Sequence, residues 1–142
     1  STKYVFVPEP SVAPSSGQAD NLTVNVANAT IDGSGDKEIW GITIENTGVS
    51  SIIIDKMTVI WSGAPGGTKI NEITIDSSVA WSGNSNSVDE LDITDFTLSA
   101  GQTYSINAID FSKDMTGTII EITFTMGDAT TKSTGDFSPP DG

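Results

Sequence analysis

Apolar side chains alternate with polar ones along most of the chain, and this alternation constrains the fold more than any other feature. Leu22, Val24 and Val26 alternate with Asn and Thr, and the segment from Ile120 to Met126 has the same period of two. Successive side chains of a strand point to opposite faces of a sheet, so this period predicts half-buried strands. No segment keeps helical spacing for more than one turn. The sequence therefore predicts an all-β protein, an antiparallel immunoglobulin-like β-sandwich of about seven to nine strands.

The alternation breaks at two places. The inward positions are even-numbered up to Ile54 and odd-numbered from Met57, so the pattern slips at Asp55–Lys56. A second slip occurs at Thr94–Asp95. A slip of one residue moves all following side chains to the other face, so each break predicts a bulge, a bend or a strand that changes sheets.

The chain divides into three parts. Residues 1–19 hold a short apolar segment followed by a linker rich in Pro, Ser and Gly. Residues 20–134 carry the alternating segments and form the predicted β-sandwich domain. Residues 135–142 are rich in Pro and Gly, and we expect a flexible tail that cannot pair in a sheet.

Composition excludes several kinds of chemistry. The chain has no His, Cys or Arg, and nineteen carboxylates against six lysines give a formal charge of −13. It therefore lacks the usual neutral-pH base, thiolates and the bidentate fork that binds phosphates, and its negative field would repel nucleic acid. We expect a protein that is not an enzyme. No apolar run is long enough to span a membrane, so any anchor is expected upstream of Ser1.

The densest group of oxygen ligands is the acidic cluster Asp89, Glu90, Asp92 and Asp95. Calcium takes six to eight oxygen ligands, so this cluster is the candidate metal site, and calcium is the one cofactor that the sequence suggests. The alternative is a solvated, charged strand edge that discourages aggregation.

Three tryptophans are candidates for a sugar-stacking or partner surface. Trp40 and Trp61 fall in register with inward apolar positions, which predicts that they pack in the core. Trp81 follows a short apolar run and has the weakest case for burial. It is the aromatic residue that we expect at a partner surface.

The segment Tyr4, Val5, Phe6 and Val7 is a second candidate partner contact, because it is apolar and separated from the domain by a linker. It could be the first strand of the domain's own sheet, or the remnant of a connection to an upstream anchor. It could also be donated to the edge of a neighbouring subunit, and repetition of such a contact builds an open filament.

Two N-x-T sequons make Asn21 and Asn28 candidate glycosylation sites, provided that the chain is exported into a glycosylating compartment. Asn21 and Thr23 both face outward by the alternation, which agrees with accessibility.

Several strings resemble those of archaeal cell-surface proteins. Glu45-Asn46-Thr47-Gly48, followed by Ile52–Asp55 and Val59–Trp61, resembles a recurring turn between strands in their immunoglobulin-like domains. The string Phe111–Gly117, running into Ile120–Asp128, is similar to the closing strands of archaeal type IV pilin-like proteins. The resemblance covers roughly residues 20–134 and extends to archaellum accessory proteins of the cell envelope.

The resemblance implies a β-sandwich carried outward by an N-terminal hydrophobic helix that anchors the protein or assembles a filament. This sequence lacks that helix. We therefore expect an extracellular or cell-surface structural domain, whose partners are the subunits of a filament or envelope layer. The alternative is a carbohydrate- or calcium-binding module of a secreted protein, which would use Trp81 and the acidic cluster.

Overall fold

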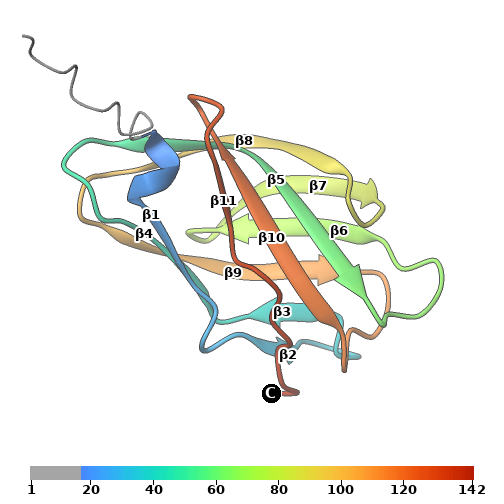
Figure 1. The fold of residues 1–142 in the computed structure, drawn as a ribbon. Helices are drawn as coiled ribbons and strands as arrows, with labels where there is room; N and C mark the ends of the chain where they lie inside the picture. Colours follow the sequence, from blue (N-terminus) through green and yellow to red (C-terminus); the bar gives the residue numbers. More distant parts are fainter. Residues whose placement is uncertain (1–16) are drawn as a thin grey trace, which may run out of the picture.

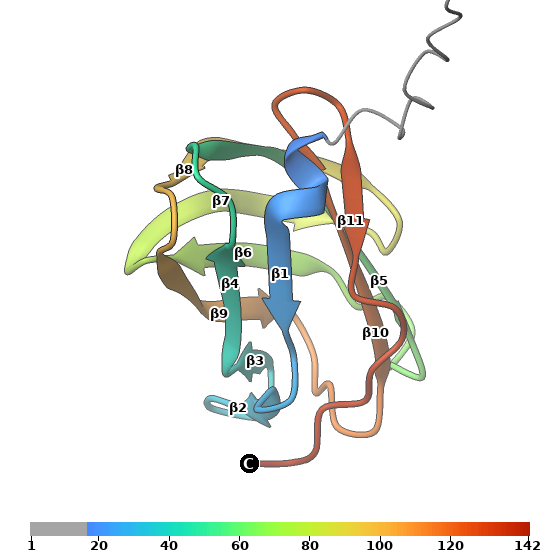
Figure 2. The ribbon, with the colours of Figure 1, turned by 60° about the vertical axis from the view of Figure 1, so that its left-hand side comes forward.

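The computed structural model describes residues 17–142 and contains two antiparallel β-sheets whose inner faces share one core (Figures 1 and 2). A short 3-10 helix, η1 (Gln18–Asn21), precedes the first strand. Among these residues no helix is long and apolar enough to cross a membrane. The all-β prediction and the two-sheet arrangement are confirmed.

The larger sheet is organised around one strand, β9 (Thr103–Phe111), which pairs with three others. One side of β9 pairs with β4 and β3, and the other side pairs with β6. The remaining strands extend the sheet outward from these neighbours. The other six strands are β1 (Leu22–Asn25), β2 (Thr30–Asp32), β3 (Glu38–Trp40), β4 (Ile42–Asn46), β6 (Ile70–Ile75) and β7 (Ser78–Ser85).

The smaller sheet has the order β11-β10-β5-β8. Its strands are β5 (Ile52–Ser62), β8 (Glu90–Leu98), β10 (Ile119–Met126) and β11 (Thr131–Ser133). The described residues thus form eleven strands, and the predicted seven to nine is too few. The prediction missed three-residue strands such as β2, which are too short to show an alternation.

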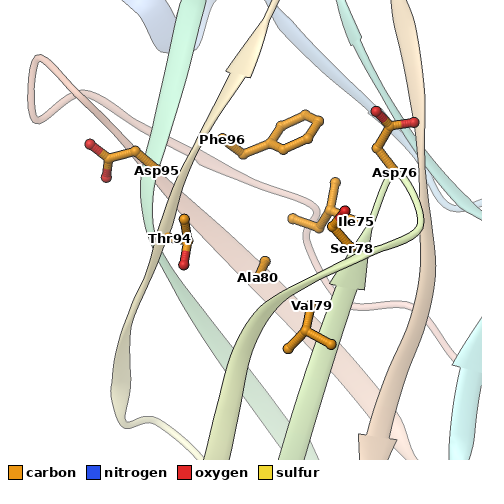
Figure 3. Close-up of a pocket in the computed structure, with 8 residues that line it drawn as sticks. All are labelled: Ile75, Asp76, Ser78, Val79, Ala80, Thr94, Asp95 and Phe96. Carbon is orange, nitrogen blue, oxygen red and sulfur yellow. The ribbon is translucent and has the colours of Figure 1, made fainter.

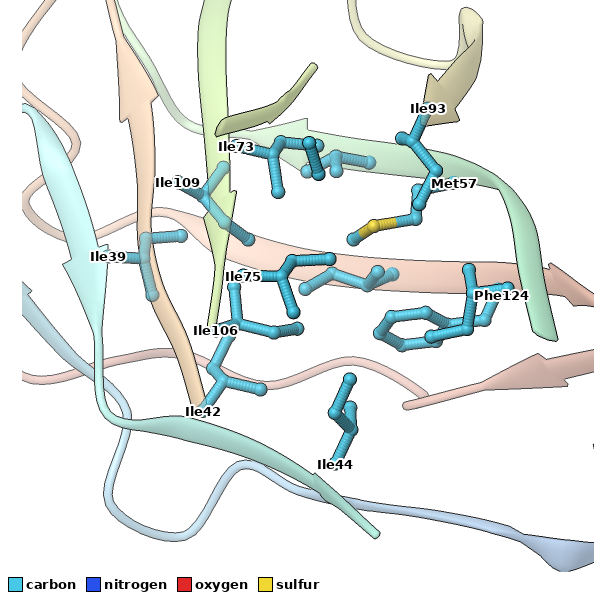
Figure 4. Packing of buried hydrophobic residues seen from close by; sticks show 14 of the residues in the cluster. Ile39, Ile42, Ile44, Met57, Ile73, Ile75, Ile93, Ile106, Ile109 and Phe124 are labelled. Atoms are coloured by element: carbon cyan, nitrogen blue, oxygen red, sulfur yellow. The ribbon is translucent and has the colours of Figure 1, made fainter. Parts of the chain in front are cut away.

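The core lies between the sheets and is built mainly from isoleucine (Figure 4). Ile39, Ile73 and Ile109 come from the larger sheet, while Met57 and Phe124 come from the smaller one, and all five are fully buried. Isoleucine is branched at Cβ and fits the pleated surface of a strand, so the same residue type favours the strands and fills the layer between them.

The two predicted breaks in the alternation face each other in the structure. The register of β5 shifts between Ile54 and Lys56 against both β8 and β10. In the β5–β8 ladder Ile54 lies opposite Phe96 and Lys56 lies opposite Asp92, so Asp55 and residues 93–95 of β8 are outside the regular pairing. The two slips are therefore one irregularity shared by neighbouring strands, and the bulge prediction is confirmed.

The prediction that Trp40 packs in the core is wrong. Trp40 is 43% exposed, whereas Ile39 and Ile42 on either side of it are buried. Gly41 lies between them with φ +89°, and a Cβ at this position would come within 2.1 Å of the carbonyl oxygen of Asn28. Only glycine tolerates this conformation and this approach, so the chain shifts by one residue here and turns Trp40 outward.

Trp61 behaves as predicted. It is partly buried against the core, and its ring meets that of Phe111 edge to face at a centroid distance of 5.2 Å. This orientation is favoured by the ring quadrupoles, so the pair stabilises one end of the core beyond the area that it buries.

The C-terminal segment pairs with the sheets, which corrects the expectation of a flexible tail. Phe137 exchanges two backbone hydrogen bonds with Ile120, both of 2.8 Å. Farther along, the N–H of Ile31 donates to the carbonyl of Pro140, and the N–H of Gly142 donates to Ile31. Proline lacks only the donor, so its carbonyl still accepts at an edge.

The folded part also begins earlier than residue 20. The side chain of Gln18 accepts a hydrogen bond from the N–H of Ile53, and the N–H of Ala19 donates to Thr130. Ala19 is buried. These contacts attach residues 18 and 19 to the smaller sheet.

Asn46 connects the two sheets through its buried side chain. Its Nδ2 donates to the carbonyl oxygens of Ser50 (2.8 Å) and Leu98 (3.0 Å), and its Oδ1 accepts from the N–H of Gly48 (2.9 Å). Asn46 ends β4 in one sheet and Leu98 ends β8 in the other. The Asn-Thr-Gly turn noted in the sequence therefore has a physical role, because its first residue satisfies three backbone groups at the joint.

Replacing Asn46 should destabilise the domain. Asn46→Ala leaves buried backbone groups without partners, and we expect a loss of about 2–4 kcal/mol in the free energy of unfolding. Urea unfolding followed by tryptophan fluorescence measures it. The exposed Asn84→Ala variant is the control and should stay within about 0.5 kcal/mol of the parent. Equal stability of the two variants would contradict this role.

Removing residues 135–142 should also destabilise the domain, by about 2–4 kcal/mol, because several backbone hydrogen bonds to Ile31 and Ile120 are lost. The same urea titration measures the effect. Asp136→Ala, an exposed change within this segment, should have little effect. A truncated chain as stable as the parent would mean that the segment does not contribute to folding.

Candidate interaction site

The two sheets fail to join along one side of the molecule, between β7 and β8. These strands follow each other in the chain and are separated only by residues 86–89. Within residues 17–142, however, β7 is hydrogen-bonded only to β6, and β8 only to β5. We call the facing edges of β7 and β8 the open seam.

A cavity of about 210 Å³ lies in the open seam, at the end away from residues 86–89 (Figure 3). Its apolar lining includes the buried side chains of Ile75 and Ala80 together with Phe96. Asp76 and Asp95 stand on opposite sides of it. The cavity thus combines an apolar interior with one carboxylate, that of Asp76, at its rim, whereas the carboxylate of Asp95 points away from the cavity and is hydrogen-bonded to Asp55 of β5.

Phe96 forms one wall of the cavity, and the ring of Tyr104 packs against it. Its ring meets that of Tyr104 edge to face, with a centroid distance of 5.1 Å. The hydroxyl oxygen of Tyr104 accepts a hydrogen bond from the N–H of Ser99 at 3.0 Å, which fixes the second ring in turn. This wall therefore keeps its position without a ligand.

The opposite wall is the turn between β6 and β7. Asp76 and Ser77 both have positive φ, 50° and 67°, which is the conformation of the tight turns that connect hairpin strands. The N–H of Asp76 donates to the carbonyl of Ser105, and the N–H of Ser77 donates to the side chain of Asn107. These bonds to β9 offset the cost of the left-handed conformation in two residues that are not glycine.

The two edges of the open seam differ in charge. Strand β7 has no charged residue, and its Val79 is 54% exposed. Strand β8 carries three residues of the predicted acidic cluster, and Glu90, Asp92 and Asp95 are all exposed. In the part of the chain that the structure describes, Lys56 pairs with them, and its Nζ lies 3.8 Å from Glu90.

The structure does not gather the acidic cluster into a metal site. Among residues 17–142 no three acidic side chains lie close enough to hold one ion. Asp89 instead accepts a hydrogen bond from the N–H of Asn86. A side-chain hydrogen bond with Asp55 and, after it, desolvation and the charges of Asp55 and Asp92 raise the pKa of Asp95. In this arrangement the four carboxylates form a charged strand edge.

The other predicted site residues are placed as follows. Trp81 lies on β7, is partly buried against the core and covers Gly83, so it presents only part of its ring to a partner. Asn21 lies in η1 with its side chain against Gly48, while Asn28 is exposed in the turn before β2. The segment from Tyr4 to Val7 lies outside the described residues.

Sequence reasoning missed a row of acidic residues on the outer face of the larger sheet. Glu38 and Glu72 flank Asp110 on the two neighbouring strands, and Trp40 donates to Glu38 beside them at 3.0 Å. Partial burial and then the charges of Glu38 and Glu72 raise the pKa of Asp110. These residues are far apart in the chain, so only strand pairing could reveal the row.

No protein-family model matches the chain, and a search of curated proteins finds no match to its sequence.

The acidic row predicts a specific pH dependence of stability. A raised pKa in the folded state means that Asp110 favours folding below its ordinary pKa, and that this contribution is lost as the pH rises through the raised value. Asp110→Asn removes the repulsion, so the variant should gain stability over the parent at pH 7 but not at pH 3. The measurement is the urea midpoint across this range. Asp136→Asn, on an exposed residue, is the control, and an equal gain in both variants would contradict the prediction.

Proposed function

We propose that this chain is a non-enzymatic assembly domain that acts through strand-edge contacts with other protein subunits. The observation that carries the proposal is β7, an eight-residue edge strand with no charged residue and with Val79 exposed. Natural proteins protect exposed edges with charged residues, as β8 does here, because an unprotected edge pairs with other chains. The exposed edge of β8 carries charged residues and that of β7 carries none, and this difference supports β7 as the edge that pairs with a partner strand.

The contact that we infer is β-augmentation, in which an extended segment of a partner adds a strand to the sheet. Backbone hydrogen bonds supply affinity in this mode, and pockets for alternate side chains supply specificity. The cavity beside β7 is such a pocket. If each subunit both donates and receives a strand, the contact is heterologous and repeats into an open filament.

We further propose that the domain works outside the cell, in a surface filament or envelope layer of the pilin-like kind. The resemblance of the Asn46-Thr47-Gly48 turn and the closing strands supports this assignment. A surface with a formal charge of −13 and no arginine also suits a domain that packs and is displayed, and it disfavours nucleic acid as a partner.

Charging the β7 edge should abolish assembly. Val79→Lys places a gatekeeper charge on the strand, and we expect subunit association to fall below detection with the melting temperature unchanged. Sedimentation velocity and negative-stain microscopy of the full-length protein measure association. Val49→Lys is the matched control, because Val49 is 97% exposed in the turn after β4. Normal assembly by the Val79→Lys protein would refute the proposal.

A further inference from the structure

The open seam has the features of a groove that takes one more strand. Within residues 17–142 neither facing edge has a hydrogen-bonded partner strand, and an apolar cavity opens between the two edges. The walls of this cavity, Phe96 on one side and the turn at Asp76 on the other, are both held by contacts to β9 or its flanking residues. A groove with fixed walls binds at a lower entropic cost than one that must first form.

The chemistry of the groove specifies its occupant. The apolar lining of Ile75, Ala80 and Phe96 calls for an apolar side chain, and the volume of about 210 Å³ suffices for an aromatic ring, since a cavity of about 150 Å³ binds benzene. The carboxylate of Asp76 at the rim favours a cation within a few residues of that ring. The occupant is therefore an extended apolar strand with a lysine near one end.

The N-terminal segment of the chain has this composition. Lys3 directly precedes Tyr4-Val5-Phe6-Val7, and it is the one lysine among the first 36 residues. Nine residues separate Val7 from Gly17, a length that spans up to about 30 Å when extended. The segment is thus long enough to reach beyond its own domain.

We propose that Lys3–Val7 of one copy occupies the open seam of a second copy, with Phe6 in the cavity and Lys3 beside the carboxylate of Asp76. The inference rests on the proposed function and adds the identity of the donated strand and of its receptor. Because donor and receptor surfaces differ, each copy can receive one strand and donate another.

Cross-linking tests the pairing directly, since the chain has no cysteine of its own. A Val5→Cys chain is mixed with a mass-tagged Val79→Cys chain and oxidised, and mass spectrometry identifies the products. We expect a mixed covalent dimer joined through residues 5 and 79. The control receptor is Ile119→Cys, which is similarly exposed but lies on β10 outside the open seam, and it should yield little mixed dimer.

The doubly substituted Val5→Cys/Val79→Cys chain separates donation from folding back. A product linked within one chain, together with no mixed dimer between chains, would overturn the proposal in favour of pairing within one domain. Cross-linking to residue 119 as efficient as to residue 79 would overturn it as well.

Charge exchange tests the role of Lys3. Lys3→Glu should weaken association about tenfold, because it places a carboxylate beside Asp76. Adding Asp76→Lys to this variant should restore most of the loss, whereas Lys132→Glu, on β11, should have little effect. Unchanged association in the Lys3→Glu chain, or no rescue by the second change, would overturn the placement of Lys3.

The proposed function and the identity of the donated strand can be refuted separately. If Val79→Lys abolishes assembly but no cross-link forms and Lys3→Glu has no effect, the donated strand is another segment and the proposed function stands. If Val79→Lys also leaves assembly intact, both proposals are refuted.

Discussion

Two sheets without a disulfide are held face to face here by a single apolar layer. Its members are mostly branched aliphatic side chains, and the buried polar residues of the described chain are Asn46, Thr68 and Thr118. The hydroxyls of both threonines donate to nearby backbone carbonyls, and Asn46 satisfies three backbone groups at the joint between the sheets. Burial supplies the cohesion, and these hydrogen bonds remove the cost of the polar groups that the layer must include.

The apolar layer reaches one side of the molecule, at β7 and β8, where the two sheets are not hydrogen-bonded to each other. Apolar positions on β7 and β8 face the shared core, but the chain passes from one sheet to the other within residues 86–89, and no hydrogen-bonded ladder joins the two edges. A ladder there would join the two sheets into one continuous sheet along this side. What remains is an apolar cavity with polar edges, a geometry suited to receiving a strand.

Charge separates the two edges of this opening. Carboxylates along β8 protect one edge against chance pairing, while β7 has no charged residue. The partner strand that we propose combines apolar side chains with a lysine, which would complement the apolar cavity and the carboxylate of Asp76.

Sequence reasoning predicted the all-β class, the outward or inward side of most strand residues, and the position of the bulge at Asp55 and Asp95. These properties are local, because the two-residue alternation and its breaks depend only on consecutive residues. It failed at Trp40, where the approach of Asn28 to Gly41 reverses the alternation, and at the C-terminal segment, where Pro140 accepts from Ile31 more than a hundred positions away. Only the tertiary structure decided these points, together with the cavity and the acidic row at Asp110, because each depends on contacts between residues distant in the chain.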